Sequence, residues 1–228
     1  MPKKKPSQDK QQDVKEQGAL GFSESYWREN YHNLDDMDGI YNARDHALYL
    51  RAVFALDQIQ IRSVADFGFG PGHLFAAVLD TFKPYKCLGL EPSISAFTRA
   101  QQLLKRSGST LLHTDLLSWC RDESQQKRFD LGLCTSVLQY LNDEELAQVL
   151  PILAQRLKYL YLTVPTSHEQ QRFIDEYDFI DNYAYSRSRE QYLAMLSPYF
   201  TIVSGRILES KQHFNEKNSD FTENLYRF

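Results

Sequence analysis

The chain has 228 residues, of which 42% are hydrophobic and 25% charged, as in an ordinary globular protein. Its formal net charge of −4 argues against a partner such as nucleic acid, whose binders usually present a basic face. No apolar run approaches the roughly 20 residues that cross a bilayer, so we expect no membrane partner. Cys87, Cys120 and Cys134 form no CxxC pair, which favours reduced thiols and a cytoplasmic location.

The amino-terminal part divides into two segments. Residues 1–18 are rich in Lys, Gln, Asp and Pro without an apolar repeat, so we expect a disordered tail. Residues 19–60 are dense in aromatic side chains, and apolar residues between Tyr41 and Ile59 recur at near-helical spacing. We therefore expect an N-terminal helical cap over 19–60, followed by the main domain over 61–228.

Short apolar runs and helical patterns then alternate along the chain. The predicted strands are RSVADFG (62–68), KCLGLE (86–91), TLLHTD (110–115), RFDLGLCTSV (128–137) and KYLYLTV (158–164). The predicted helices cover 71–82, 93–108, 142–157 and the stretch from residue 189 to Pro198. This alternation is typical of an α/β fold with a doubly wound, mostly parallel sheet.

The carboxyl-terminal part changes pattern. Residues 200–210 and 222–228 are predicted as two strands with no helix between them, which predicts a C-terminal antiparallel hairpin and seven strands in all. Between the fifth strand and its helix, residues 168–188 form a long aromatic stretch that we expect to be a loop. Loops of this length are often lids or binding elements.

The stretch VADFGFGPGHLF, from Val64 to Phe75, carries three glycines at every second position. A turn this bare lets backbone approach a ligand at the end of the first strand. Dinucleotide sites use GxGxxG, but His73 stands where the third glycine of that pattern belongs. A nicotinamide-dependent oxidoreductase is therefore disfavoured, although not excluded.

The spacing DxGxGxG, formed by Asp66, Gly68, Gly70 and Gly72, resembles the first motif of the class I S-adenosylmethionine-dependent methyltransferases. The carboxylate suits a donor that carries a sulfonium cation and an amino group rather than a pyrophosphate. The resemblance covers roughly residues 40–228 and implies the seven-stranded fold of that family, with S-adenosylmethionine as cofactor. Phe69 departs from it, because the family usually has a small residue between the first two glycines. A ring there either crowds the donor or forms part of its pocket wall.

The resemblance assigns further residues to the donor site. Glu91, which ends the second strand, would accept hydrogen bonds from the ribose hydroxyls. Asp115 would bind the adenine amino group, although capping a short helix is an alternative role that is compatible with it. Leu116 would offer backbone or apolar surface to the ring, Thr135 would lie near the methyl donor, and Arg44 would pair with the donor's carboxylate.

The acceptor side is less defined by the sequence. Candidate substrate-binding residues are Tyr26, Tyr31, Tyr140, His168 and Tyr185. Aromatic surfaces suit a small-molecule methyl acceptor with an apolar or aromatic part, or an ammonium group. We expect no metal site, and no catalytic base can be assigned.

Three readings of the function therefore stay open besides the oxidoreductase. The first is a methyltransferase that acts on a small molecule, as a monomer or homodimer. The second is a protein side-chain methyltransferase. The third is a non-catalytic subunit that binds S-adenosylmethionine for regulation or assembly, a reading that depends on Phe69 blocking the site.

Overall fold

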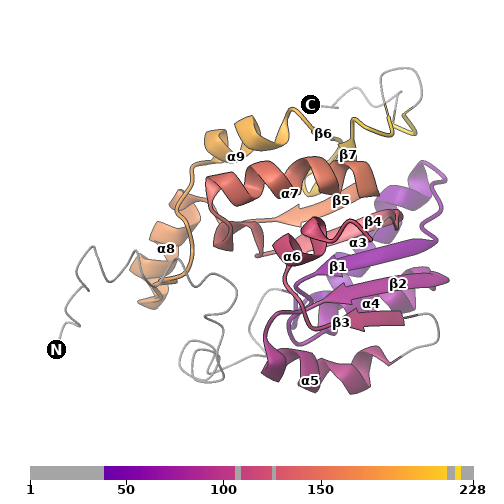
Figure 1. Ribbon diagram of the computed structural model, residues 1–228, viewed down its shortest axis with the longest axis horizontal. Helices are drawn as coiled ribbons and strands as arrows, with labels where there is room; N and C mark the ends of the chain where they lie inside the picture. Colours follow the sequence, from indigo (N-terminus) through magenta and orange to yellow (C-terminus); the bar gives the residue numbers. More distant parts are fainter. Residues whose placement is uncertain (1–38, 106–108, 125–126, 215–218, 222–228) are drawn as a thin grey trace.

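The computed structural model describes residues 39–105, 109–124, 127–214 and 219–221 (Figure 1). The predicted tail at 1–18, most of the predicted cap, Tyr26, Tyr31 and the predicted strand at 222–228 lie outside the described residues. No helix among the described residues combines the length and the apolar character that crossing a membrane requires.

The bounds of the elements follow the predicted alternation. The helices are α3 (Ala43–Leu56), α4 (His73–Phe82), α5 (Ile94–Leu104), α6 (Leu116–Arg121), the 3₁₀ helix η3 (Leu138–Tyr140), α7 (Asp143–Arg156), α8 (Ser167–Tyr177) and α9 (Arg189–Leu196). The strands are β1 (Ser63–Phe67), β2 (Lys86–Leu90), β3 (Ser109–Leu112), β4 (Phe129–Thr135), β5 (Leu157–Thr163), β6 (Phe200–Ile202) and β7 (Ile207–Ser210).

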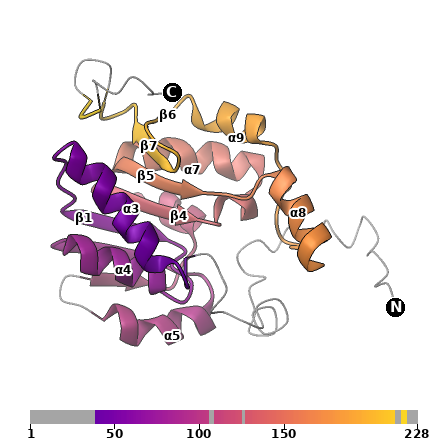
Figure 2. The ribbon, with the colours of Figure 1, turned by 180° about the vertical axis from the view of Figure 1, so that it is seen from behind.

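The seven strands form one sheet in the order β3-β2-β1-β4-β5-β7-β6. The first five pair in parallel, whereas β7 runs antiparallel to both β5 and β6. Helices α6, α7 and α9 cover one face, and α3, α4 and α5 cover the other (Figures 1 and 2). The predicted doubly wound α/β sheet with a C-terminal hairpin is thus confirmed.

Two local predictions were wrong. Residues 200–210 are not one strand but the whole hairpin, because the chain turns at residues 203–206 and returns as β7. Residues 168–188 are not simply a loop, since most of α8 lies within them. This helix buries no residue and projects from the body of the domain (Figures 1 and 2).

The register of the parallel strands places their carboxyl ends side by side. Asp66, near the end of β1, pairs with Gly89 on β2 and with Leu133 on β4. All five residues of β1 are buried, as a central parallel strand covered on both faces requires. The turns that follow β1, β2 and β4 therefore meet at one edge of the sheet, where ligands of doubly wound folds bind.

Gly132 tests how tightly this sheet is packed. A Cβ at this position would lie 3.0 Å from Cε2 of Phe67 and would also overlap the side chain of Leu157. We expect Gly132→Ala to lower the free energy of unfolding by about 1–3 kcal/mol, because the core has no room for the methyl group. Urea denaturation measures this loss. The control is Gly205→Ala, where a Cβ meets no described atom within 4 Å and the change should stay within about 0.5 kcal/mol. Equal losses in both variants would contradict the prediction.

Candidate functional site

The glycine turn joins β1 to α4 with a backbone that side chains would obstruct. Gly68, Gly70 and Gly72 have φ angles of 100°, 52° and 86°, a region that favours glycine. A Cβ at Gly68 would lie 2.7 Å from Cγ2 of Val137, whereas one at Gly70 would meet no described atom within 4 Å. Gly68 thus lets the segment after β4 lie directly against the turn, and Gly70 leaves space beside it.

Glu91 holds this turn in place from the end of β2. Its carboxylate accepts hydrogen bonds from the backbone N–H groups of Gly70 and Ser93, each at 2.8 Å. The side chain is buried, and burial raises the pKa of Glu91 to about 7 despite these two bonds. The residue predicted to bind ribose hydroxyls therefore also shapes the loop.

Asp66 is a second buried carboxylate at the same edge. Only 2% of the residue is exposed, and its Oδ1 atom has no hydrogen-bond partner. Burial raises the pKa of Asp66 well above its ordinary value, and the nearby Glu91 adds to this effect. The buried Oδ1 of Asp66 thus lacks the hydrogen bond that buried polar atoms usually make.

The ring of Phe69 points into the core instead of filling the crevice. It is stacked near Phe75 with ring centroids 6.5 Å apart, and its centroid lies 6.0 Å from that of Phe97. The absence of a side chain at Gly89 makes room for it, because a Cβ there would lie 2.8 Å from the Phe69 ring. The unusual residue of the motif thus packs between the sheet and its helices.

Asp115 caps α6, which is the alternative role that the sequence left open for it. Its Oδ1 accepts from the backbone N–H of Ser118 at 2.8 Å, and its Oδ2 accepts from the Ser118 hydroxyl at 2.6 Å. The side chain of Leu116 is buried in the core, so this residue can face a ligand only through its backbone. Contact of either residue with adenine stays a prediction.

Two further predicted donor-binding residues lie in different surroundings. Thr135 ends β4 at the carboxyl edge and is half-buried, next to Ser136, whose φ of 54° marks a sharp turn. Arg44 is exposed in the first turn of α3. Among the described residues, the structure thus brings Asp66, the glycine turn, Glu91 and Thr135 to one edge of the sheet.

The candidates for the acceptor side lie beyond β4 and β5. Tyr140 donates a hydrogen bond to Oδ2 of Asp181 at 2.8 Å, and the backbone N–H of Tyr185 donates to the carbonyl of Gln139 at 2.8 Å. Tyr140 and Tyr185 therefore lie near each other in the structure. His168 is exposed on α8.

Two residues of this region were missed by the sequence analysis. Gln139 is 3% exposed, and its Oε1 has no hydrogen-bond partner. Arg187 is 4% exposed and binds Asp143, a residue 44 positions away. No signal in the sequence marks either residue, because burial of a glutamine or an arginine depends on tertiary packing.

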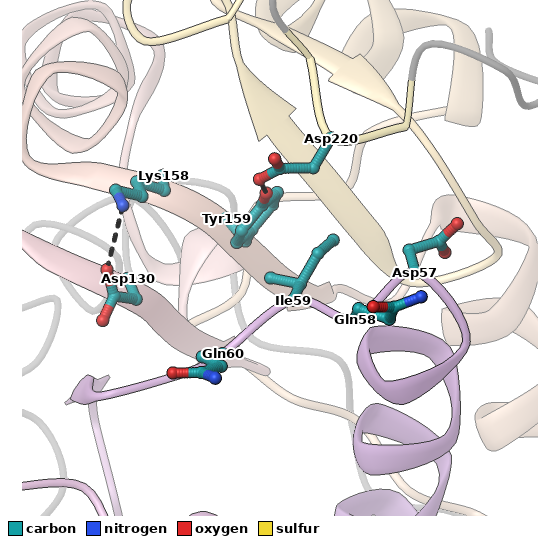
Figure 3. Close-up of a pocket in the computed structure, with 8 residues that line it drawn as sticks. All are labelled: Asp57, Gln58, Ile59, Gln60, Asp130, Lys158, Tyr159 and Asp220. Carbon is teal, nitrogen blue, oxygen red and sulfur yellow. Dashed lines mark hydrogen bonds and ion pairs between the residues drawn. The ribbon is translucent and has the colours of Figure 1, made fainter.

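A separate pocket of about 260 Å³ lies at the opposite edge of the sheet, where β4 and β5 begin (Figure 3). Its lining comprises Asp57, Gln58, Ile59, Gln60, Asp130, Lys158, Tyr159 and Asp220. Four of its polar side chains form two pairs, Tyr159 with Asp220 and Lys158 with Asp130 at 3.3 Å. None of the predicted site residues lines this pocket. Within the described part of the chain, no group of three or more His, Cys, Asp or Glu residues is placed to hold a metal ion.

Comparisons with known proteins agree with this geometry. Residues 64–159 match a family described as a methyltransferase domain. No curated protein sequence matches the chain.

Several solved structures share the fold at low sequence identity. The plantazolicin methyltransferase BpumL, in complex with S-adenosylhomocysteine (SAH), is 17% identical at a TM-score of 0.60, over 84% of this chain and 77% of that one. The N-methyltransferase NodS from Bradyrhizobium japonicum WM9 is 16% identical at a TM-score of 0.55, over 77% and 98%. The small RNA methyltransferase HEN1 is 16% identical at a TM-score of 0.57, over 74% and 25%.

The raised pKa of Glu91 makes stability depend on pH. The folded state keeps a proton on this carboxyl up to about pH 7, whereas an ordinary glutamate loses it near 4.5. The folded state therefore binds more protons between these values, and stability falls as the pH rises through them. Relative to Glu91→Gln, the wild type should lose on the order of 2 kcal/mol of unfolding free energy between pH 5 and pH 8. Urea denaturation of both proteins at several pH values measures it. A difference that stays constant with pH would show that the pKa is not raised.

Proposed function

We propose that this chain is a class I S-adenosylmethionine-dependent methyltransferase that transfers a methyl group to a small molecule with an apolar or aromatic part. The observation that supports the proposal most directly is the bare turn at Gly70. Open space adjoins this glycine, and two buried carboxylates lie at the same edge of the sheet.

The residues at this edge fit S-adenosylmethionine. The open side of Gly70 admits the donor, and the unpaired Oδ1 of Asp66 suits its positive charge. Glu91 in its ionised form accepts hydrogen bonds from the ribose hydroxyls while it continues to hold the loop. Thr135 and the segment through Val137 form the side that faces the reacting methyl group. Arg44 would approach the carboxylate of the donor from α3, and Asp115 with Leu116 would face adenine.

When bound, the donor supplies an activated methyl group, so the protein mainly aligns and shields the reactants. The chain's contribution is to hold the donor at a fixed place, to orient the acceptor behind the methyl group and to exclude water. No residue is assigned as a general base. Phe69 takes no space from the donor, because its ring packs among Phe75 and Phe97. This packing favours catalysis over the non-catalytic reading, which depended on a blocked site.

Tyr140 and Tyr185 support an acceptor with an apolar or aromatic part. They lie just past the end of β4, on the side of the glycine turn that Val137 contacts. Tyrosine rings pack against apolar groups and also attract an ammonium group. A protein side chain is the second candidate acceptor, and the exposed α8 with His168 would then contribute to the protein contact. The solved structures with this fold include one methyltransferase named for plantazolicin and one named for small RNA, so the fold alone does not identify the acceptor.

The cellular compartment and the class of acceptor are inferred from the cysteines and the net charge. The three cysteines are buried free thiols, which supports a reducing compartment such as the cytoplasm. The acidic balance of the chain favours a small-molecule acceptor over nucleic acid. We propose that the enzyme acts in the cytoplasm as a monomer or homodimer.

Gly70→Val tests the donor site. A β-branched residue at a φ of 52° is strained, and its side chain would enter the space assigned to the donor. We expect the affinity for SAH, measured by calorimetry, to fall roughly 100-fold or more while the fold persists. Gly205→Val is the control, because it lies in the turn before β7, which β4 and β5 separate from β1 in the sheet, and it should bind like the wild type.

The wild type must also turn over an acceptor. Incubation with S-adenosylmethionine and a panel of aromatic amines, phenols and thiols, with SAH release as the readout, tests this. Unchanged affinity in Gly70→Val would show that the turn is not the site. Tight SAH binding without turnover of any member, or of a peptide library, would favour a non-catalytic subunit.

A further inference from the structure

Residues 181–187, which we call the cover segment, lie against the turn between β4 and α7. Asp181 at its start accepts the hydrogen bond from Tyr140, and Tyr185 donates its backbone N–H to the carbonyl of Gln139. Both tyrosines of the proposed acceptor pocket are therefore fixed by contacts of this one segment.

Arg187 closes the segment at its other end. Its Nε and Nη2 donate to Oδ1 of Asp143 at 2.9 and 2.6 Å, and Nη2 also donates to the carbonyl of Leu141 at 2.8 Å. The guanidinium lies 5.2 Å from the ring centroid of Tyr185 and 5.8 Å from that of Tyr192. The buried guanidinium of Arg187 thus donates hydrogen bonds to the start of α7 and lies over the ring of Tyr185, a predicted substrate-binding residue.

The backbone of Arg187 also connects the cover segment to α8. Its backbone carbonyl accepts from the N–H of Ser167 at 2.7 Å, which ties the start of α8 to the cover segment. A buried guanidinium is costly to leave unpaired, because its charge then lacks a partner away from water. Arg187 therefore favours one position of the cover segment over others. The side chain of its partner Asp143 is 70% exposed, so Asp143 can be substituted without opening the core.

We propose that Arg187 is the positioning residue of the acceptor pocket: it holds the cover segment so that Tyr140 and Tyr185 face the acceptor. The inference rests on the proposed function, since it assigns these tyrosines to the acceptor. Gln139 is consistent with this proposal, because its buried Oε1 atom has no hydrogen-bond partner within the described structure. An acceptor with an N–H or O–H group is the chemistry that supplies such a partner.

The test compares Arg187→Gln, Arg187→Lys and Asp143→Asn with Arg189→Gln as control, which removes a similar charge from an exposed neighbouring site. Hydrogen exchange of the full chain reports the backbone amides of Tyr185 and Ser167. We expect exchange about 10-fold or more faster in Arg187→Gln, a smaller increase in Asp143→Asn and partial rescue in Arg187→Lys, because an ammonium cannot form the same paired bonds. Arg189→Gln should match the wild type.

Two further measurements separate positioning from a general structural role. In spectra of ¹³C-labelled tyrosine, the signals of Tyr140 and Tyr185 should shift in Arg187→Gln, while those of the buried sheet residues Tyr159 and Tyr161 stay unchanged. SAH affinity should stay within about two-fold of the wild type, and with the acceptor found by turnover the loss should fall on KM more than on kcat.

The outcomes are distinct. Unchanged Tyr185 exchange in Arg187→Gln, or a loss of protection spread equally over β1 and β4 together with weaker SAH binding, would overturn the proposal. Absence of SAH binding by the wild type would instead overturn the proposed function, and the exchange and tyrosine spectra would still decide whether Arg187 holds the cover segment.

Discussion

The hydrogen bond from the N–H of Gly70 to the Glu91 carboxylate, 2.8 Å long, is the contact on which the site depends. Apart from the buried ring of Phe69, the turn after β1 offers few side chains that could hold its shape, so it also relies on backbone hydrogen bonds. The carbonyl of Leu90 accepts from the N–H groups of Gly68 and Phe69, and Glu91 adds the next bond along the turn. One strand end, that of β2, thus fixes the conformation of the loop that follows its neighbour β1.

This arrangement also accounts for the class of ligand. Asp66 and Glu91 are both buried, and each has a raised pKa because burial disfavours its charge. A positively charged donor offsets that cost, whereas a pyrophosphate at the start of α4 would face two carboxyl groups and be repelled whenever they ionise. The two carboxyl groups therefore add an electrostatic argument against dinucleotides only in their ionised form, beside the spacing argument at His73.

The parts of the site that the sequence predicted are the parts fixed by local structure. The glycines mark positive φ angles, Glu91 follows directly from the end of a strand, and Asp115 caps the helix that begins at the next residue. The direction of the Phe69 ring was not predictable, because it depends on the space left by Gly89 on another strand. The hairpin was misplaced for a related reason: both of its strands are very short, at three and four residues, and together resemble one longer strand.

The acceptor side differs from the donor side in the range of its contacts. Tyr140 binds Asp181 across 41 residues, and Arg187 binds Asp143 across 44. Those contacts come from the stretch between β5 and α9, whose helix α8 buries nothing in the core. That stretch is therefore held mainly by its contacts with the segment after β4, not by burial of α8 in the core. Under the proposed function, the donor would lie against the strand ends, and the acceptor would lie against a segment that long-range polar contacts place beside them.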